Sequence, residues 1–393
     1  MRDEKIKSSK EPLIHITKKE DMPLWKAILV RVVAILIAFL FSSLLAYLFI
    51  GADPGKFLKA FVDANFGTGD RVWVLIKDVA VLLCIGIAVT PAFRMKFWNI
   101  GAEGQVLISA LASVAVIMYA PAEWPEWLLV LMMLVAALLS GMIWAIIPAI
   151  FKAIWNTNET LFTLMMNYVA TYFVGYCLIK WTPNGSSVLG RLSRGYLPVL
   201  GNQYLLLILV VAVVTVIMFI YMYYSKQGYE ISVVGESVRT ANYIGINVKK
   251  VIVRTMAISG LLCGLTGFLI VAALDHSVSV TTVGGRGFTA IIVSWLGKFN
   301  PFIMILTSFL LVFISQGAGR LSTVFRVSNA FPDVVAGIVI FFVIGCEFFI
   351  RYKLHFRHSK TEGSGGGGKA GIKGPDSNDK KPDVPEKKDE GVS

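Results

Sequence analysis

Long apolar segments separated by short polar ones recur along the chain from residue 27 to residue 350. An α-helix needs about 20 apolar residues to cross the ~30 Å hydrocarbon core of a bilayer. The pattern predicts about ten spans, at residues 27–50, 72–91, 98–119, 127–150, 160–181, 203–224, 251–273, 287–299, 301–316 and 332–350. The segment 287–299 is short for a complete crossing. We therefore expect an all-α, polytopic integral membrane protein with one broken or re-entrant helix.

The two ends of the chain are polar. Residues 1–26 are rich in lysine, whereas residues 352–393 are rich in Gly, Lys, Asp and Pro and hold almost no large apolar residue. Such a tail cannot bury a core, so we expect it to be disordered. The segment 27–50 is too long for a signal peptide and lacks a convincing cleavage site, so it is expected to remain as the first span. A membrane domain, 27–351, thus separates two polar ends.

Basic residues are unevenly distributed between the loops. Ten spans place both termini on the same side, together with the longest loop on that side, residues 225–250. This side holds Lys5, Lys7, Lys10, Lys18, Lys19, Lys26, Arg94, Lys96, Lys152, Lys226, Arg239, Lys249, Lys250, Lys298, Arg351, Lys353 and Arg357. The opposite loops hold fewer basic residues. Because basic loops stay in the cytoplasm, we expect both termini to be cytoplasmic.

The composition excludes an ordinary soluble protein. Of the 393 residues, 56% are hydrophobic and 16% are charged, whereas soluble domains have about 25% charged residues. The net charge of +12 resides in tails and short loops, so it does not indicate nucleic-acid binding. Each of the cysteines lies in an apolar segment without CxxC spacing, which favours core positions over disulfides or a metal site; they are Cys84, Cys177, Cys263 and Cys346.

The segment Phe97–Gln105 places two glycines and three polar side chains at the start of a span. Polar groups at membrane depth must face a cavity or a protein partner, because lipid cannot form hydrogen bonds with them. In a helix, Asn99 and Glu103 would share one face while Gln105 points elsewhere. Two interpretations stay open: a broken helix that lines a substrate path, and hydrogen bonding that holds helices together.

A polar ridge follows one face of the span 160–181. Its members recur every four residues: Glu159, Thr163, Asn167 and Thr171. This spacing directs them into the helix bundle rather than toward lipid. The ridge is typical of a hydrophilic conduit, and structural hydrogen bonding between helices would require it as well.

The loop 225–250 contains a short helical pattern, Gly235–Gly245, that a glycine ends. Ile231, Val234, Val238, Ala241 and Ile244 form an apolar stripe at helical spacing. Such a helix is suited to docking a partner protein. The alternative is a helix that lies flat on the membrane surface.

No catalytic arrangement is evident in the sequence. Ser-His-Asp, Cys-His and HExxH combinations are missing, and Asp275–His276 has no neighbouring ligand that would complete a metal site. The tail segment Gly363–Lys369 approaches a phosphate-binding loop, but Ala370 stands where Ser or Thr should bind magnesium. We expect neither enzymatic activity nor a cofactor in this chain.

Four segments resemble the permease subunits of bacterial ATP-binding-cassette (ABC) importers for nucleosides, ribose and related simple sugars. They are Phe97–Gln105, Asn158-Glu159 through Met165–Tyr168, Gly235–Gly245 followed by Ser259-Gly260 and Gly264, and Gly285–Phe288 through Gly297 to Asn300-Pro301. The similarity covers roughly residues 70–345 and extends to a larger set that also serves branched-chain amino acids. Trp98 and Thr240 depart from the family pattern, in which Phe and Ala are usual.

The resemblance implies a transport subunit of the bacterial cytoplasmic membrane. Its implied partners are ABC ATPase subunits that bind ATP and magnesium, a second permease (a paralogue or an identical copy), and an extracytoplasmic substrate-binding protein, often a lipoprotein. On the matching motifs, Asn99, Glu103, Gln105 and Asn167 become pathway candidates, and the polar ridge adds Glu159 and Thr163. The implied ATPase-coupling candidates lie in the loop 225–250: Gly235, Glu236, Arg239, Ala241, Tyr243 and Gly245.

An ion-coupled secondary transporter of a small polar solute is the alternative. That class needs a charged residue deep in a span, and Glu103 and Glu159 are the candidates. An intramembrane enzyme is disfavoured, because no catalytic arrangement exists. The sequence does not separate nucleosides from sugars as substrates, nor a homodimer from a heterodimer of permeases.

Overall fold

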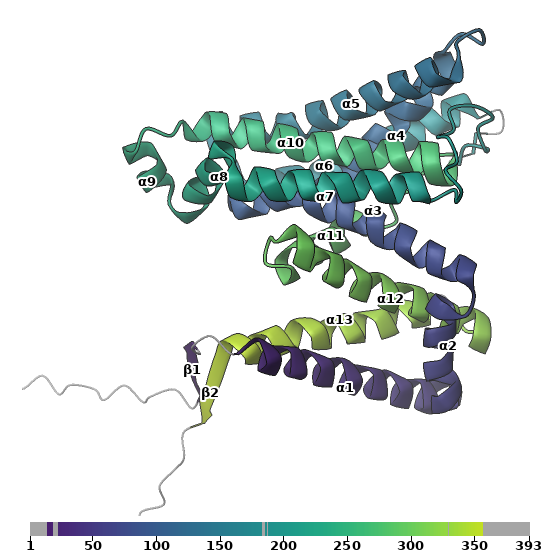
Figure 1. Ribbon diagram of the computed structural model, residues 1–393, viewed down its shortest axis with the longest axis vertical. Coiled ribbons are helices and arrows are strands. Elements are labelled where there is room, and N and C mark those ends of the chain that lie inside the picture. The colour runs from purple at the N-terminus through teal and green to yellow at the C-terminus, as the bar shows by residue number, and fades with distance from the viewer. Residues whose placement is uncertain (1–13, 19–22, 183–184, 187, 329, 357–393) are drawn as a thin grey trace, which may run out of the picture. The chain divides into compact units, whose positions relative to one another are not determined.

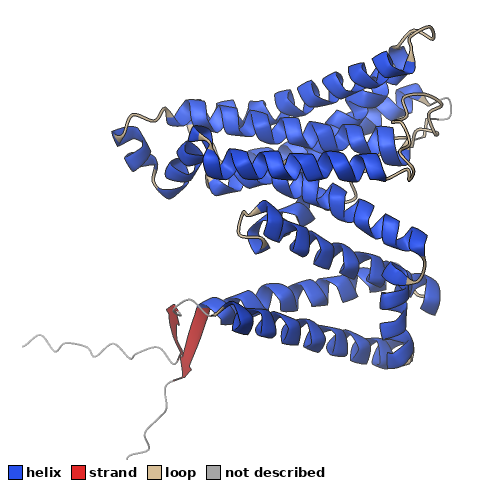
Figure 2. Cartoon of the chain, viewed as in Figure 1, coloured by secondary structure: helices blue, strands red, loops and turns tan. Residues whose placement is uncertain are grey.

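The computed structural model describes residues 14–18, 23–182, 185–186, 188–328 and 330–356, and most of them are helical (Figure 2). The α-helices are α1 (Leu24–Ile50), α2 (Pro54–Phe66), α3 (Gly69–Arg94), α4 (Ala102–Tyr119), α5 (Glu126–Trp155), α6 (Glu159–Trp181), α7 (Leu205–Tyr224), α8 (Lys226–Glu236), α9 (Val238–Tyr243), α10 (Val248–Leu269), α11 (Arg286–Leu296), α12 (Pro301–Phe325) and α13 (Ala330–Arg351). A π-helical turn, η1 (Ile270–Asp275), extends α10.

In the described part of the chain, nine helices are long and apolar enough to cross a membrane. These are α1, α3, α4, α5, α6, α7, α10 with η1, α12 and α13. The remaining predicted span, 287–299, corresponds to α11, which has 11 residues and is therefore about 16 Å long, half of a hydrocarbon core. The polytopic all-α membrane domain with one short helix is thus confirmed.

Helix α2 was not expected from the apolar pattern, because only one of its faces is apolar. Asp53 caps it by accepting a hydrogen bond from Gly55 N at 3.1 Å, and Pro54 is its first residue. Phe57 and Phe61 are buried. Asn65 Nδ2 donates to the carbonyl oxygen of Phe313 in α12 at 3.2 Å, so α2 packs across α12 (Figure 1).

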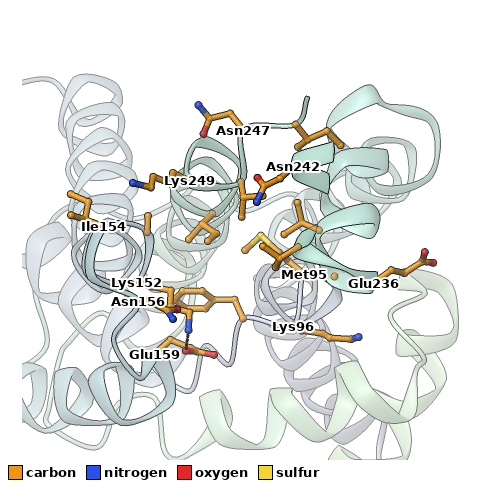
Figure 3. A pocket seen from close by; sticks show the side chains of 18 of the residues that line it. Met95, Lys96, Lys152, Ile154, Asn156, Glu159, Glu236, Asn242, Asn247 and Lys249 are labelled. Atoms are coloured by element: carbon orange, nitrogen blue, oxygen red, sulfur yellow. Dashed lines mark ion pairs between the residues drawn. The ribbon is translucent and has the colours of Figure 1, made fainter. Parts of the chain in front are cut away.

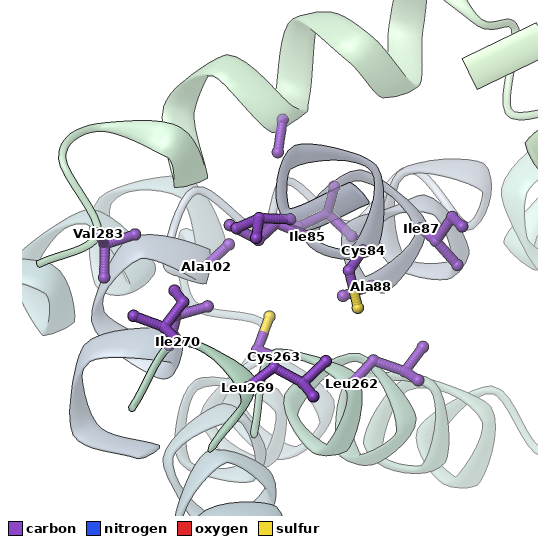
Figure 4. Close-up of a cluster of buried hydrophobic side chains, with 14 of the residues drawn as sticks. Cys84, Ile85, Ile87, Ala88, Ala102, Leu262, Cys263, Leu269, Ile270 and Val283 are labelled. Carbon is purple, nitrogen blue, oxygen red and sulfur yellow. The ribbon is translucent and has the colours of Figure 1, made fainter. Parts of the chain in front are cut away.

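The main core lies where α3 and α10 pack against each other and against α4 and α5. Figure 4 shows Cys84 of α3 facing Cys263 of α10 among aliphatic side chains. Both thiols are free and buried, which confirms their expected place in the core. Helices α5 and α10 approach closely because glycines meet there. A Cβ at Gly260 would lie 2.9 Å from the carbonyl carbon of Gly141.

The start of α1 and the end of α13 lie together. Arg31 Nε donates to Glu347 Oε1 at 2.8 Å, and their ion pair joins the two helices. Helices α8 and α9 lie at this same end of the bundle (Figure 1). The beginning and the end of the membrane domain therefore lie at the same end of the bundle.

The chain's two ends form a small separate sheet. Strand β1 (Ile14–Lys18) pairs with β2 (Tyr352–Phe356) in antiparallel register, with Ile14 opposite Phe356 and Lys18 opposite Tyr352. The expected disordered tail, 352–393, therefore begins with a strand, and its remainder, 357–393, lies outside the described residues together with Gly363–Lys369. Composition alone missed this strand because its partner is more than 300 residues away.

The loop 225–250 contains two helices rather than one. Helix α8 ends at Glu236, and Ser237 starts α9 by accepting a hydrogen bond from Thr240 N at 3.2 Å. The apolar stripe predicted across this point is therefore interrupted: Ile231 and Val234 are buried in α8, whereas Val238 is exposed. The serine is a strong helix N-cap, and this local signal outweighs the apolar spacing.

Candidate transport site

The connection from α3 to α4, residues 95–101, is an irregular segment in which Met95, Phe97, Asn99 and Gly101 are buried whereas Lys96 and Trp98 are exposed. Asn99 is completely buried. Its Oδ1 accepts from Gly101 N at 3.1 Å and from Gln105 Nε2 at 3.2 Å, and its Nδ2 donates to Ser259 Oγ at 3.3 Å. Non-helical backbone at membrane depth needs such internal partners. Asn99 and Gln105 therefore stabilise the break that precedes α4.

Helix α6 holds this segment from the other side. The side-chain amide of Asn167 bonds to two backbone groups of the segment: its Nδ2 donates to Ile100 O at 2.9 Å, and its Oδ1 accepts from Gly104 N at 2.9 Å. Thr163 Oγ1 accepts from Ile100 N at 3.2 Å. A side chain at Gly104 would collide with Asn167, since a Cβ there would lie 2.9 Å from Oδ1. This explains why the motif has glycine at this position.

Glu103 connects α4 to the short helix α11. Its Oε1 accepts from Gly285 N at 2.8 Å and its Oε2 from Gly287 N at 2.7 Å. The carboxylate therefore satisfies backbone donors at the start of α11, where the helix dipole also favours negative charge. A Cβ at Gly287 would lie 2.7 Å from Glu103 Oε2, so this glycine leaves room for the carboxylate.

The structure brings four of the six pathway candidates into one hydrogen-bonded group around residues 99–105: Asn99, Gln105, Thr163 and Asn167. Glu103 belongs to the same stretch of chain, but its carboxylate bonds to the start of α11. Each of them has a protein partner, so the arrangement has the geometry of hydrogen bonding between helices, one of the two interpretations that the sequence left open. Direct contact of these side chains with a solute stays a prediction.

The sixth candidate, Glu159, lies apart from that group, at the end of the bundle that holds α8 and α9. Its Oε2 forms an ion pair with Lys152 Nζ at 2.8 Å. The pair lines a cavity of about 980 Å³, which is shown in Figure 3. Other walls come from residues 95–97, from α8 and α9, and from the start of α10. Glu159 therefore belongs to the same surface as the predicted coupling loop.

The coupling candidates divide into buried and exposed residues. Gly235 and Ala241 are buried, and Gly235 packs directly on the backbone of Arg94 at the end of α3. Glu236, Arg239, Tyr243 and Gly245 are exposed, and Tyr243 has 92% of its surface accessible. The first two attach the loop to the bundle, and the other four form a surface that a partner can reach.

A charged cluster around Asp78 was not identified as a site from the sequence. Asp78 Oδ1 pairs with Lys77 Nζ and with Arg286 Nη2, both at 3.2 Å, and Oδ2 accepts from Gln316 Nε2 at 2.7 Å. The cluster joins α3, α11 and α12. Lys77 and Asp78 are neighbours in the sequence, but Arg286 and Gln316 lie more than 200 residues away, so nothing in the sequence indicated them as partners.

Two tryptophans lie at the opposite end of α11 from Arg286. Trp98 and Trp295 stack with ring centroids 5.4 Å apart and an interplanar angle of 20°. Both are more than 40% exposed. Trp98, one of the two residues that depart from the family pattern, therefore packs against α11 and contributes to an accessible aromatic surface.

The loop before α7 folds over the end of α10 that is far from α9. Leu189 N donates to Val278 O at 3.0 Å, Leu192 N to His276 O at 2.8 Å, and Leu197 N to Ala272 O at 3.0 Å. The ring of His276 packs on Tyr196 at a centroid distance of 4.1 Å. These bonds attach the loop along one short stretch of backbone, 272–278.

Comparison with known proteins agrees with this architecture. The family described as branched-chain amino acid transport system / permease component matches residues 74–344. A guanosine ABC transporter permease protein, NupP of Bacillus subtilis, is 28% identical over 83% of this chain and 95% of its own length. A glucose ABC transporter permease protein, TsgB13 of Haloferax volcanii, is 28% identical over 87% and 93%. A nucleoside ABC transporter permease protein, NupB of Lactococcus lactis, is 24% identical over 84% and 93%.

Proposed function

Because the chain belongs to the family of branched-chain amino acid transport system permease components, we propose that it is the membrane-spanning permease subunit of an ABC importer for nucleosides or a related simple sugar. The observation that carries the proposal is the family match over residues 74–344. Relatives named for guanosine, nucleosides and glucose support the substrate class. They also favour an ABC permease over an ion-coupled secondary transporter.

The chain is a transport component of the bacterial cytoplasmic membrane rather than an enzyme. Energy comes from partner ATPase subunits, which bind ATP and magnesium and switch the bundle between outward-open and inward-open states. A second permease, either a paralogue or an identical copy, completes the membrane part. An extracytoplasmic binding lipoprotein delivers the solute.

The ATPase docks on the exposed part of the loop 225–250. Arg239 and Tyr243 project from α9, while Ala241 attaches the helix to the bundle. A movement imposed on α9 would reach α3, because the backbone at Gly235 rests on Arg94. Helix α3 leads directly into the irregular segment 95–101. A movement of the docking surface would therefore reach the hydrogen-bonded group around Asn99 through the end of α3.

Mild-detergent purification of the tagged chain from its native membranes, followed by mass spectrometry, tests this proposal. We expect an ATPase with nucleotide-binding motifs, a second permease and a lipoprotein to co-purify. The lipoprotein is then titrated with nucleosides and with sugars to identify the substrate. Recovery of a stable chain alone, together with uptake that depends on a proton gradient, would refute the importer.

A further inference from the structure

Helix α8 is the part of the loop 225–250 that lies against the bundle. Ile231 and Val234 are buried, and a Cβ on Gly228 would collide with the backbone oxygen of Met222. Helix α8 therefore starts in close contact with the end of α7 (Figure 1). Helix α9, the proposed docking element, follows α8 after the single residue Ser237, so a displacement of α9 also acts on α8.

One ion pair joins α8 to α10. Arg254 Nη2 donates to Glu230 Oε2 at 2.8 Å, and the two side chains are 25% and 18% exposed. Tyr221 of α7 lies beside both charges, and its hydroxyl donates to Gln227 Oε1 at 3.1 Å. Among the residues that the structure describes, the loop 225–250 forms no other ion pair. Charge therefore attaches this loop to α10 alone.

The geometry of the pair differs from that of a strongly stabilising one. A guanidinium binds a carboxylate most strongly through two parallel hydrogen bonds. Here only Nη2 contacts the carboxylate, and the buried Arg254 Nε has no partner within the described residues. Such a pair gains little stability over well-packed apolar side chains. It does fix the position of α8 along α10, because a hydrogen-bonded pair is directional whereas hydrophobic contact is not.

Helix α10 connects this pair to the irregular segment 95–101. Arg254 is the seventh residue of α10 (Val248–Leu269), about 9 Å along the axis from its start. Ser259 lies little more than one turn further along the same unbroken helix, and its Oγ accepts from Asn99 Nδ2 at 3.3 Å. A displacement of α10 at Arg254 would therefore reach Asn99 through Ser259.

The other attachment of α8 to the bundle is steric. A Cβ on Gly235 would collide with the backbone oxygen of Arg94, at the end of α3. A steric contact resists the approach of two elements but not their separation, whereas an ion pair resists separation as well. The contact at Arg94 can therefore push the bundle, and the pair between Glu230 and Arg254 can also pull it.

We propose that Glu230 and Arg254 are positioning residues of the coupling step, through which a displacement of α9 and α8 pulls α10 and reaches the segment that holds Asn99. Both act through α10, because their charged groups face each other between the two helices rather than the docking surface. This role rests on the proposed function, since only a partner ATPase would displace α9. It adds a second connection, beside the one through α3, between the docking surface and the bundle.

Neutralisation and exchange of the two charges test this role in the assembled importer. Uptake of guanosine and of glucose is measured in proteoliposomes together with ATP hydrolysis, and the readout is solute transported per ATP hydrolysed. We expect Glu230→Gln and Arg254→Gln each to lower this ratio by about fivefold or more, as loss of a typical coupling between sites would, while the ATPase still co-purifies. The exchange Glu230→Arg with Arg254→Glu should restore most of the ratio, because it rebuilds the pair with reversed charges.

The pair between Glu126 and Arg194, at the end of the bundle away from α9, provides the matched control. Its charged atoms are 3.4 Å apart, and we expect Arg194→Gln to leave the transport ratio unchanged. The double variant Glu230→Gln with Arg254→Gln should be no worse than either single variant, because one change already breaks the pair. An unchanged ratio in both single variants at an equal yield of complex, or defects that multiply in the double variant, would overturn the role.

Hydrogen exchange of residues 95–101 follows the movement without any solute. We expect ATP with vanadate to change amide exchange there in the wild-type complex, and to change it much less in Arg254→Gln. An equal change in both would overturn the connection through α10, even if neither guanosine nor glucose is the substrate. Purification of the wild type without an ATPase would refute the proposed function and this role together, whereas normal ATP-driven uptake by Arg254→Gln refutes the role alone.

Discussion

At the scale of single residues, a few side chains replace backbone partners that helices lack at their ends. Glu103 does so for the first turn of α11, and Asn167 does so for the backbone around Ile100 and Gly104. Glycines beside both side chains provide the necessary room. Asn99, Glu103 and Asn167 therefore stand out in the sequence because each supports backbone that lacks helical partners.

Substitution of Glu103 tests this role directly. Glu103→Ala leaves the N–H groups of Gly285 and Gly287 without an acceptor, at a cost of about 1–3 kcal/mol for each buried group. We expect a lower Tm in detergent and strongly reduced uptake, although the subunit still assembles. Glu103→Gln retains one acceptor oxygen and should lie between. Glu123→Ala, at an exposed loop position, is the control, and an unchanged Tm for Glu103→Ala would contradict the proposed support of α11.

His276 predicts a pH dependence of the loop that covers the end of α10. Burial, followed by the nearby Arg191 guanidinium, lowers the pKa of His276. The folded state therefore favours the neutral imidazole, so its contribution is complete above about pH 6.5 and is lost as the pH falls through the lowered pKa. We expect Tm to fall between pH 7 and 5, and to fall less in His276→Asn, because asparagine tolerates the left-handed backbone at this position (φ 49°). Identical pH profiles would refute this assignment.

At the scale of elements, contact between helices depends on small residues where backbones meet. Helices α5 and α10 touch at Gly141, Gly260 and Gly264, and a Cβ at Gly264 would lie 2.9 Å from the Cα of Leu138. Such small-residue spacing allows membrane helices to approach closely. This pair of helices joins the two parts of the sequence that precede and follow the loop 225–250.

Gly260→Ala should therefore be far more damaging than an ordinary alanine substitution. Its Cβ would meet the backbone of Gly141, which cannot move away as a flexible side chain could. We expect a large loss of folded protein, measured by fluorescence-detected size-exclusion chromatography. Gly345→Ala in α13, where no atom lies within 4 Å of the new Cβ, should be neutral or stabilising by up to about 1 kcal/mol through helix propensity. Equal yields of the two variants would argue against close α5–α10 packing.

We expect helix α9 to couple ATP hydrolysis on the partner subunit to transport, and not to contribute to the stability of the bundle. Arg239→Ala combined with Tyr243→Ala removes exposed side chains, so folding should be unaffected while substrate-stimulated ATP hydrolysis separates from transport. Tyr47→Ala serves as control, because Tyr47 is 57% exposed and lies near the C-terminal end of α1, at the end of the bundle away from α9. Measurement of ATPase activity and uptake in proteoliposomes decides the matter, and full stimulation in the double variant would place the docking site elsewhere.

At the scale of the whole molecule, the membrane domain starts and finishes on one side. Helices α1 and α13 are joined by the Arg31–Glu347 pair, and the strands that precede and follow them pair with each other. The short helix α11 and the turn that precedes it allow this arrangement with nine full-length helices. Which side of the membrane holds the ends stays a prediction from the charges.

Topology mapping tests that orientation. A green fluorescent protein fused after residue 351 should fluoresce, because it folds in the cytoplasm, whereas alkaline phosphatase at that position should be inactive. Alkaline phosphatase inserted within residues 120–125 should be active. The physical reason is the excess of Lys and Arg on the side of the termini. The reverse pattern of activities would invert the membrane orientation and place α9 outside.

The apolar pattern by itself determined the membrane class, the approximate place of the spans and the shortness of residues 287–299. These features follow from local composition, since lipid requires a continuous apolar stretch of a fixed length. The four segments that resemble the permease family also indicated the permease class. The sequence missed α2 and β2, because an amphipathic helix and a five-residue strand depend on what they pack against.

Only the tertiary structure shows which partners the polar residues have. Asn99 meets Ser259, and Glu103 meets Gly285, across 160 and 182 residues of chain. The sequence assigned both to a site but could not choose between a conduit and internal hydrogen bonding, because that choice depends on which atoms occupy the remaining bonding positions. In a bilayer, a polar side chain needs a hydrogen-bond partner from the protein, and here that partner comes from a distant part of the sequence.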